Sequence, residues 1–308
     1  MNRGSKSLLA ASCLALASFA VQAQNSSSAT SGHHHHHHAR AHAHRASFSL
    51  DGPGLRSSAA LVLDATHSSV LYSRNADVAM PIASISKLLT ALTVADARQP
   101  MDEVIEITDE DRAIGKGAYS RLTVGTRLTR ADLFHLALMA SENRAAHALA
   151  RNYPGGMAAF MPAMNAKARA LGMTSSHFVE PTGLSSENVA SPEDLSKLVI
   201  AASENATIRE YSTDPNYEVR VGRRMIEFRN TDSLVSNPTW DIVVQKTGYI
   251  AEAGRCLVMQ TVIAGRTVVI VLLNSFGKQT RVADATRIRR WMEAKLLTAG
   301  ASAVASKT

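Results

Sequence analysis

The chain has 308 residues, 45% of them hydrophobic, which is ordinary for a globular protein and fits one compact domain with two lobes. Its formal net charge is +7 and its pI about 9.6, but the lysines and arginines are scattered and no basic patch with interleaved aromatic residues occurs, so we expect no nucleic-acid partner. A basic exterior suits an anionic cell wall or a peripheral contact with a membrane surface, and plain solubility explains it equally well.

The first residues resemble a secretory signal peptide. Arg3 and Lys6 precede an apolar run, and Val21-Gln22-Ala23 places small residues where signal peptidase cuts. We therefore predict a signal peptide over residues 1–23, cleavage after Ala23 and export to the periplasm. Loss of Arg3 and Lys6 takes the formal charge from +7 to +5. A retained membrane anchor is the rival, but the run is short and rich in Ala and Ser for a span of ~20 residues.

The chain has two cysteines, Cys13 and Cys256. Lipid attachment at Cys13 is an alternative to cleavage after Ala23, since the preceding residues faintly resemble a lipobox, but it would leave the apolar stretch after Cys13 without a purpose. If Cys13 leaves with the signal peptide, Cys256 is the only thiol of the mature chain and no intramolecular disulfide can form. We expect Cys256 to be a buried core residue.

Residues 24–55 differ in composition from the rest and are dominated by Ser, Ala, Gly and His. With no hydrophobic period to bury a face, they predict a disordered linker. The linker holds eight of the twelve histidines, His33 to His38, His42 and His44, as an affinity tag or as a natural tract. A disordered tract supplies no preorganised site, so we predict neither a metal nor another cofactor. A folded domain over residues 56–300 and a disordered tail over 301–308 complete the prediction.

The folded part begins with strand signals and continues with helices. Residues 58–64 and 70–73 predict two strands, and apolar spacing predicts a helix over 83–97. Thr129 with Asp132 resembles a capping box, a further helix follows Gly156, and Ser191-Pro192 is another helix start, so residues 110–210 are predicted to be helical. Strands over 217–228, 241–247, 255–263 and 267–273 and a last helix over 280–297 follow. This order predicts an α+β fold with a mainly antiparallel sheet.

Three short strings stand in a fixed order: Ser84-Ile85-Ser86-Lys87, Ser141-Glu142-Asn143 and Lys246-Thr247-Gly248. Ser and Lys at positions i and i+3 of a helix lie on one face, where the amine can take the proton of the hydroxyl. The set of S-x-x-K, S-x-N and K-T-G is typical of serine acyl-transfer sites. A helix start at Ser84 would also give the hydroxyl the positive end of the helix dipole.

Two of the three strings are weak when taken singly. Ser275-Phe276-Gly277-Lys278 is a second S-x-x-K, and S-x-N also occurs at Ser73, Ser186 and Ser203. Placement selects the set, because Ser84 and Lys87 open a predicted helix, Ser141 follows one, and Lys246 ends a predicted strand. Ser275 follows a strand without a helix start.

The stretch over residues 58–290 resembles the low-molecular-mass penicillin-binding proteins, which are serine D-alanyl-D-alanine peptidases. Residues 80–92 resemble the nucleophile segment of that family and residues 138–146 its second motif. Glu180-Pro181-Thr182-Gly183-Leu184 resembles a family segment near the site, to which we assign no chemical role. The resemblance implies a β-lactamase and DD-peptidase type of fold, with a sheet flanked by helices and an all-helical insert lobe, and makes residues 56–300 the catalytic domain.

Two segments are most similar to the D-alanyl-D-alanine endopeptidases of Gram-negative bacteria, which cut cross-links between peptidoglycan stem peptides. They are residues 141–146 and residues 246–256, which include Lys246-Thr247-Gly248-Tyr249-Ile250. The carboxypeptidase relatives carry an additional β-domain and an amphipathic anchor after the catalytic domain. Because this chain stops soon after its last predicted helix, we expect the endopeptidase branch.

The resemblance implies a role for each residue of the strings. Ser84 is the expected nucleophile and Lys87 the general base, with a pKa lowered from about 10.4 by burial and by a second cation such as Lys246. Ser141 would relay a proton to the leaving amine, and Asn143 would bind the substrate and Lys87. Lys246, Thr247 and Gly248 would bind the peptide and its carboxylate, and the backbone N–H groups of Ser84 and Tyr249 would form the oxyanion hole. A β-lactam should acylate Ser84.

Four alternatives stay open. A class A β-lactamase shares the strings, but Glu180-Pro181-Thr182-Gly183-Leu184 does not match the E-x-x-L-N pattern of its deacylating Glu. A carboxypeptidase differs only in substrate, a wall-binding protein would leave the three strings without chemistry, and a zinc peptidase would need metal ligands. The histidines outside the linker are expected to be packing or surface residues, because this chemistry needs no imidazole: His67, His135, His147 and His177.

Overall fold

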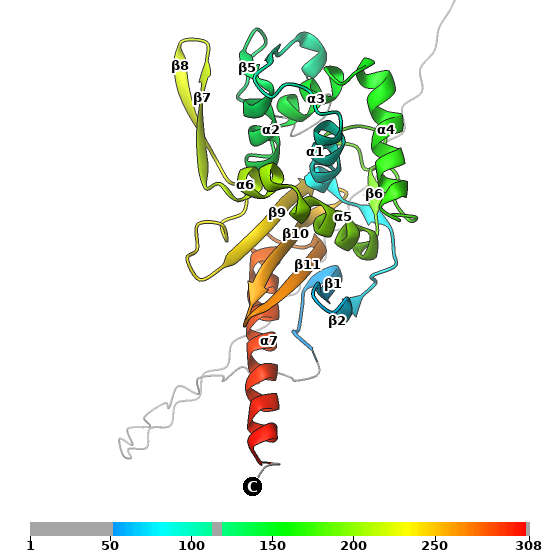
Figure 1. Cartoon of the computed structure of the whole chain (residues 1–308), viewed down its shortest axis with the longest axis vertical. Helices are drawn as coiled ribbons and strands as arrows, with labels where there is room; N and C mark the ends of the chain where they lie inside the picture. The colour runs from blue at the N-terminus through cyan, green and yellow to red at the C-terminus, as the bar shows by residue number, and fades with distance from the viewer. Residues whose placement is uncertain (1–51, 113–118, 306–308) are drawn as a thin grey trace, which may run out of the picture. The chain divides into compact units, whose positions relative to one another are not determined.

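The computed structural model describes residues 52–112 and 119–305, with side chains described as far as residue 297. The predicted signal peptide and most of the predicted linker lie outside the described residues. Within them a five-stranded sheet has the order β2-β1-β11-β10-β9, and every pairing in it is antiparallel. With the flanking helices it confirms the predicted α+β class (Figure 1).

The strands of this sheet come from the two ends of the domain. Strands β1 (Ser57–Asp64) and β2 (Ser69–Arg74) precede the helices, whereas β9 (Asp241–Ile250), β10 (Gly254–Ile263) and β11 (Arg266–Ser275) follow them. Runs of Val, Ile and Leu favour these strands, and short connections make their neighbours antiparallel. As a result, β9 lies at one edge of the sheet and β2 at the other.

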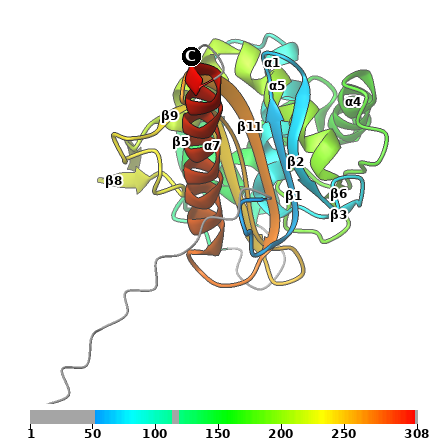
Figure 2. The same ribbon diagram turned by 90° about the horizontal axis from the view of Figure 1, so that it is seen from below.

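Alternation along the strands gives the sheet two buried faces. Leu257 and Met259 of β10 pack with Ile288 and Trp291 of helix α7 (Thr280–Ala305), which lies along one face (Figure 2). Their neighbours Val258 and Cys256, which is completely buried as expected, face the helices on the other side. Helix α7 continues to residue 305, so residues 301–305 of the predicted disordered tail are helical.

The helical lobe lies on the face opposite α7. Its elements are α1 (Ser86–Asp96), the one-turn η2 (Asp109–Asp111), α2 (Arg130–Met139), α3 (Asn143–Arg151), α4 (Gly156–Ala170), α5 (Pro192–Glu204) and α6 (Ala206–Thr213). Two short strand pairs accompany these helices, β3 (Met80–Pro81) with β6 (Val189–Ala190) and β4 (Val104–Glu106) with β5 (Arg127–Thr129), so the lobe, contrary to the expectation, is not all-helical. The capping box of Thr129 and Asp132 and the Ser191 cap are confirmed, because both side chains accept from the backbone three residues later.

Three further sequence predictions differ from the structure. The strand expected over 217–228 is a hairpin of β7 (Asn216–Val221) and β8 (Arg224–Arg229), which turns at Gly222 with φ +60°. The helix expected over 83–97 begins with a separate 3₁₀ turn, η1 (Ala83–Ile85), because Ala83 has φ +51° and cannot extend an α-helix. Strand β9 continues to Ile250, so Lys246 lies inside it and not at its end.

The described helices include none that is long and apolar enough to cross a membrane.

Candidate active site

Lys87 lies at the centre of the site, in the first turn of α1. In its protonated form, its Nζ donates hydrogen bonds to Ser84 Oγ at 2.8 Å, to Asn143 Oδ1 at 2.7 Å and to the carbonyl oxygen of Thr182 at 2.6 Å. The Lys87 side chain is completely buried, whereas Ser84 is half-buried and opens on a groove. The structure therefore brings the first two strings together around one amine.

Burial decides the protonation of Lys87. Removal from water lowers the pKa of this amine to about 8, and the negative charges of Glu180 and Glu142 oppose the shift. A substantial fraction of the amine is thus neutral slightly above neutral pH, as a proton acceptor for the Ser84 hydroxyl requires. The sequence also predicted that Lys246 lowers this pKa, but the lowering of the Lys87 pKa comes from burial, and the repulsion between the two lysines instead lowers the pKa of Lys246.

Lys246 is a second completely buried lysine, in the middle of β9. Burial lowers its pKa well below the usual range, and the positive charges of Lys87 and Arg281 lower it further, against the opposing Asp232 carboxylate. Its Nζ donates to the Thr247 carbonyl oxygen at 3.0 Å. Lys246 therefore lies behind the wall of the groove and does not form its surface, although it is coupled electrostatically to Lys87.

The groove has a volume of about 380 Å³ and gathers residues from all three strings. They are Ser84, Ser141, Asn143, Thr247 and Gly248, with Leu184, Thr231, Tyr249, Arg255 and Arg281 around them. One wall is the edge strand β9, which lies against the η1 turn. This close approach depends on Gly248, because a Cβ there would lie 2.8 Å from the Ile82 carbonyl oxygen and 3.1 Å from Ser84 N.

A break between two helices positions the second string. Helix α2 ends at Met139 and α3 begins at Asn143, and between them Ser141 has φ +58°. The Glu142 carboxylate caps α3 by accepting from Arg144 N at 3.3 Å. The break points Asn143 at Lys87 and leaves Ser141 lining the groove.

The segment Glu180-Pro181-Thr182-Gly183-Leu184 contributes to the site although the sequence assigned it no role. Its Thr182 carbonyl is one of the three acceptors of Lys87, and its Leu184 side chain lines the groove. Gly183 has φ +80°, and a Cβ there would lie 1.9 Å from the Ala83 carbonyl oxygen, so only glycine fits. The resemblance of this string to a family segment was the signal that could have identified it.

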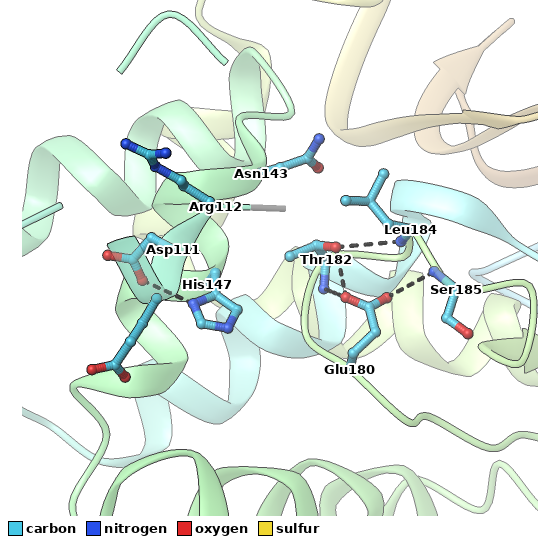
Figure 3. Close-up of a pocket in the computed structure, with 9 residues that line it drawn as sticks. Asp111, Arg112, Asn143, His147, Glu180, Thr182, Leu184 and Ser185 are labelled. Carbon is cyan, nitrogen blue, oxygen red and sulfur yellow. Dashed lines mark hydrogen bonds and ion pairs between the residues drawn. The ribbon is translucent and has the colours of Figure 1, made fainter. Parts of the chain in front are cut away.

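A second pocket of about 300 Å³ adjoins the groove and shares Asn143 and Leu184 with it (Figure 3). Asp111 forms part of its wall and contacts His147 Nδ1 at 2.8 Å. Burial opposes ionisation of Asp111, but hydrogen bonds from His147 and Arg151 lower the pKa of its carboxyl group to about 2. The Asp111 carboxylate is thus paired with His147 and Arg151.

The four histidines outside the linker pack or lie at the surface, as expected. His67 pairs with Asp64, His135 stacks at 4.2 Å on the Tyr211 ring, His147 pairs with Asp111, and the backbone of His177 bridges to Val189. Over residues 52–112 and 119–305, no group of three or more His, Cys, Asp or Glu side chains is arranged to hold a metal ion.

The sequence and the fold are similar to those of known proteins. The family model described as D-alanyl-D-alanine carboxypeptidase, Peptidase_S11, matches residues 46–277. The chain belongs to this family. It is 49% identical over 247 residues to the D-alanyl-D-alanine endopeptidase of Pseudomonas aeruginosa, covering 80% of each chain. It is 43% identical over 272 residues to the D-alanyl-D-alanine endopeptidase of Escherichia coli, covering 85% of this chain and 86% of the other.

A solved structure is similar as well. The crystal structure of the Streptomyces K15 DD-transpeptidase has a TM-score of 0.72 and 27% identity, over 78% of this chain and 98% of that one. The predicted family and the DD-peptidase type of fold are therefore confirmed. The protein is a serine-type D-alanyl-D-alanine peptidase.

Proposed function

We propose that this peptidase is a D-alanyl-D-alanine endopeptidase that hydrolyses cross-links between peptidoglycan stem peptides through an acyl-enzyme on Ser84. One observation carries the proposal: a completely buried Lys87 amine, with a pKa of about 8, lies 2.8 Å from a hydroxyl that opens on a groove. The similarity to two relatives named endopeptidases supports the choice of substrate.

In acylation, the Ser84 oxygen attacks the D-Ala carbonyl carbon while the neutral Lys87 amine takes the hydroxyl proton. The electron pair of the C=O bond moves to oxygen, which the N–H groups of Ser84 and Tyr249 stabilise. When the tetrahedral intermediate collapses, the C–N bond breaks and the leaving amine takes a proton that Lys87 supplies through Ser141. In deacylation, water attacks the ester carbonyl carbon while the Lys87 amine takes one of its protons. The bond between that carbon and Ser84 Oγ then breaks, and the proton passes from Lys87 to Ser84 Oγ as the carboxylic acid product leaves.

The groove suits an extended peptide. Strand β9 is an edge strand of the sheet and lies beside Ser84, so its backbone groups near Thr247 and Gly248 can pair with the substrate. Thr247 Oγ1 lies 2.6 Å from Thr231 Oγ1, and these hydroxyls would bind the carboxylate beside the scissile bond. Because Lys246 lies behind the wall, we assign it an electrostatic role and assign direct attraction of the carboxylate to the guanidinium of Arg281.

A β-lactam presents an amide and a carboxylate with the same spacing and should acylate Ser84. We expect slow hydrolysis of the resulting ester, in contrast to a class A β-lactamase. The Glu180 carboxylate accepts hydrogen bonds from the backbone of its own segment, among them Thr182 N at 2.7 Å and Gly183 N at 2.5 Å, and is thereby occupied. Penicillin should therefore inhibit the enzyme.

We also propose that the protein acts in the periplasm after removal of residues 1–23. Peptidoglycan is an extracytoplasmic substrate, and the sequence pattern of residues 1–23 is that of an export signal. A peripheral contact with a membrane surface stays a prediction from the net charge. Fractionation of cells that express the full chain, with mass analysis of the mature N-terminus, tests both points.

The substrate is tested by digestion of purified muropeptides. The wild-type enzyme should convert cross-linked dimers to monomers, and Ser84→Ala should leave them intact, as followed by chromatography and mass spectrometry. A carboxypeptidase is the second candidate, because the family model bears that description. It would instead release free D-Ala from uncross-linked pentapeptides and leave the dimers. Labelling by a fluorescent penicillin that maps to Ser84 would support either enzyme, and a label elsewhere would contradict both.

A further inference from the structure

The Glu180 carboxylate accepts five hydrogen bonds, from its own segment and from the residues that follow it. Its Oε2 accepts from Thr182 N at 2.7 Å and Thr182 Oγ1 at 2.6 Å, and its Oε1 accepts from Gly183 N at 2.5 Å. Longer bonds reach Oε1 from Asn188 Nδ2 at 3.1 Å and Ser185 N at 3.4 Å. Figure 3 shows this carboxylate folded back on the turn that it closes.

One of these bonds fixes the peptide group that holds Lys87. Gly183 N–H and the Thr182 carbonyl belong to the same planar unit, and in a trans peptide they point in opposite directions. Glu180 accepts from the N–H at one end, and Lys87 donates to the oxygen at the other at 2.6 Å. A carboxylate on the N–H also polarises the carbonyl and strengthens the bond from the amine.

Other hydrogen bonds attach this segment and the neighbouring Asn188 to helix α1, which follows the turn that carries Ser84. Thr90 Oγ1 of α1 donates to the Pro181 carbonyl oxygen at 2.7 Å, and Asn188 Nδ2 donates to Ser86 Oγ at 3.0 Å. Gly183 packs directly on Ala83, where no side chain could fit. The Thr182 carbonyl is therefore held in place on both sides, by Glu180 and by the turn that carries Ser84.

A count of hydrogens shows why this carbonyl matters for proton transfer. A neutral lysine amine has two hydrogens and one lone pair. Asn143 Oδ1 and the Thr182 carbonyl oxygen can only accept, so they take both hydrogens, and the lone pair is left to face Ser84 Oγ. If the Thr182 carbonyl moves, a hydrogen of the amine is free to turn toward Ser84 and the lone pair points elsewhere.

We propose that Glu180 is a positioning residue of the acylation step: it fixes the Thr182–Gly183 peptide so that the neutral Lys87 amine presents its lone pair to Ser84. The proposal rests on the function proposed above and adds a residue to it. Glu180 acts through the peptide group and does not touch the substrate carbonyl. The structure thus gives the segment Glu180-Pro181-Thr182-Gly183-Leu184 the role that the sequence left open.

The charged groups that face Lys87 determine the direction in which a substitution should shift the Lys87 pKa. They are Glu142 from the α2–α3 connection, Glu180 from its own segment and Lys246 from β9. The negative charge of Glu180 raises the pKa of Lys87 against the effect of burial. Loss of that charge should lower the pKa of Lys87, and the rise of the acylation rate with pH should move to lower pH.

The test compares Glu180→Gln with Glu187→Gln, an exposed carboxylate three residues after the end of the segment. A Gln at position 180 keeps the shape of the side chain but turns an NH₂ group toward backbone N–H donors. The second-order rate of acylation by a fluorescent penicillin is measured from about pH 6 to about pH 10, which spans the Lys87 titration, and is scaled to the folded fraction from thermal unfolding.

We expect Glu180→Gln to slow acylation at the high-pH plateau about 10- to 100-fold and to shift the pH profile to lower pH. Glu187→Gln should change neither. A slower rate with an unshifted profile would reduce Glu180 to a structural residue, and an unchanged rate would overturn the proposal outright. If the wild-type protein itself takes no label, the proposed function fails, and the two failures are thereby distinguished.

Thr182→Val provides a second variant in case Glu180→Gln does not fold. It removes the Oγ1–H bond to Glu180 at 2.6 Å and keeps both the carbonyl and the charge. A looser Thr182 peptide should slow acylation several-fold, and the pH profile should keep the wild-type position. A folded Thr182→Val variant with the wild-type rate would contradict the positioning role.

Discussion

Ser84 and Ser275 each precede a lysine by three residues, yet they occupy different kinds of position in the fold. Ser84 lies in the η1 turn before α1, so Lys87 follows on the same face and reaches its hydroxyl at 2.8 Å. Ser275 is the last residue of β11, and the chain then passes through Gly277 with φ +90°, which breaks the helical spacing. Lys278 is exposed, whereas Lys87 is completely buried.

The surroundings of the two hydroxyls differ as much as the backbone does. Ser275 is 1% exposed, and its Oγ lies 2.7 Å from Ser57 Oγ, which donates to Asp284 Oδ2 at 2.6 Å. This sealed cluster ties the start of β1 to helix α7 and admits no substrate. In the proposed mechanism, the S-x-x-K pattern therefore yields a nucleophile only where a helical turn pairs the two residues, burial favours the neutral lysine and a groove exposes the serine.

The largest effect should separate the two serines. Ser84→Ala removes the attacking oxygen, so we expect a loss of at least about 10³-fold in muropeptide cleavage and no covalent penicillin label. Ser275→Ala should keep both activities in the folded protein, because Ser275 serves only the Ser57 and Asp284 cluster. Gel fluorescence and mass mapping measure the label. Labelling of the Ser84→Ala variant would contradict the assignment of Ser84 as the labelled residue.

Replacement of each lysine by methionine should give the next largest effect. Lys87→Met replaces the buried base by an apolar side chain of similar length, and loss of general base catalysis should slow acylation about 10²- to 10⁴-fold. Lys278→Met removes an exposed charge and should leave the rate unchanged. The measurement is the second-order rate constant for penicillin labelling. Equal rates for the two variants would contradict the assignment of Lys87 as the base.

The pH profile should follow Lys87. A protonated amine cannot accept the Ser84 proton, so the rate should rise about tenfold per pH unit below the Lys87 pKa of about 8 and level off above it. The sign follows from burial, which lowers the pKa by disfavouring the charged amine. Lys278→Met should give the same curve. A rate independent of pH between about 6 and 8 would contradict a lysine base.

The smallest effect should be on stability, at one glycine near each serine. Gly183 packs on the turn that carries Ser84, and Gly277 follows Ser275 in the sequence. A Cβ at Gly183 would meet the Ala83 carbonyl oxygen at 1.9 Å, whereas at Gly277 it would meet only Thr280 Oγ1 at 3.1 Å. Gly277→Ala should therefore cost only the left-handed strain of about 1–2 kcal/mol. Gly183→Ala should cost more than about 3 kcal/mol or prevent folding. Urea unfolding measures both, and equal losses would refute the close packing of Gly183.

Local signals in the sequence predicted much of this arrangement. The spacing of Ser84 and Lys87, the capping box at Thr129 and the Ser191 cap each depend on residues three apart, so they can be identified without tertiary knowledge. The α+β class followed from the order of the elements, and the family from the length of the matching segments.

Other features depend on atoms that the residue types do not reveal. The Thr182 carbonyl is a backbone group, and its contact with Lys87 joins segments 95 residues apart. The η1 turn depends on the positive φ of Ala83, a residue that ordinarily favours a helix. The burial of Lys246 behind the groove depends on the neighbours of β9, which β-branched periodicity does not identify.

Cys256 has a practical consequence for experiments on this enzyme. Its thiol is completely buried in β10, and burial raises its pKa to about 11, so Cys256 should not react with maleimides. It is the one cysteine in the part of the chain that the structure describes. Phe276 is 93% exposed at the end of β11, and β11 and β10 pair there through Ser275 and Arg255, a groove residue. A fluorophore attached through Phe276→Cys would thus report the arrival of a peptide in real time.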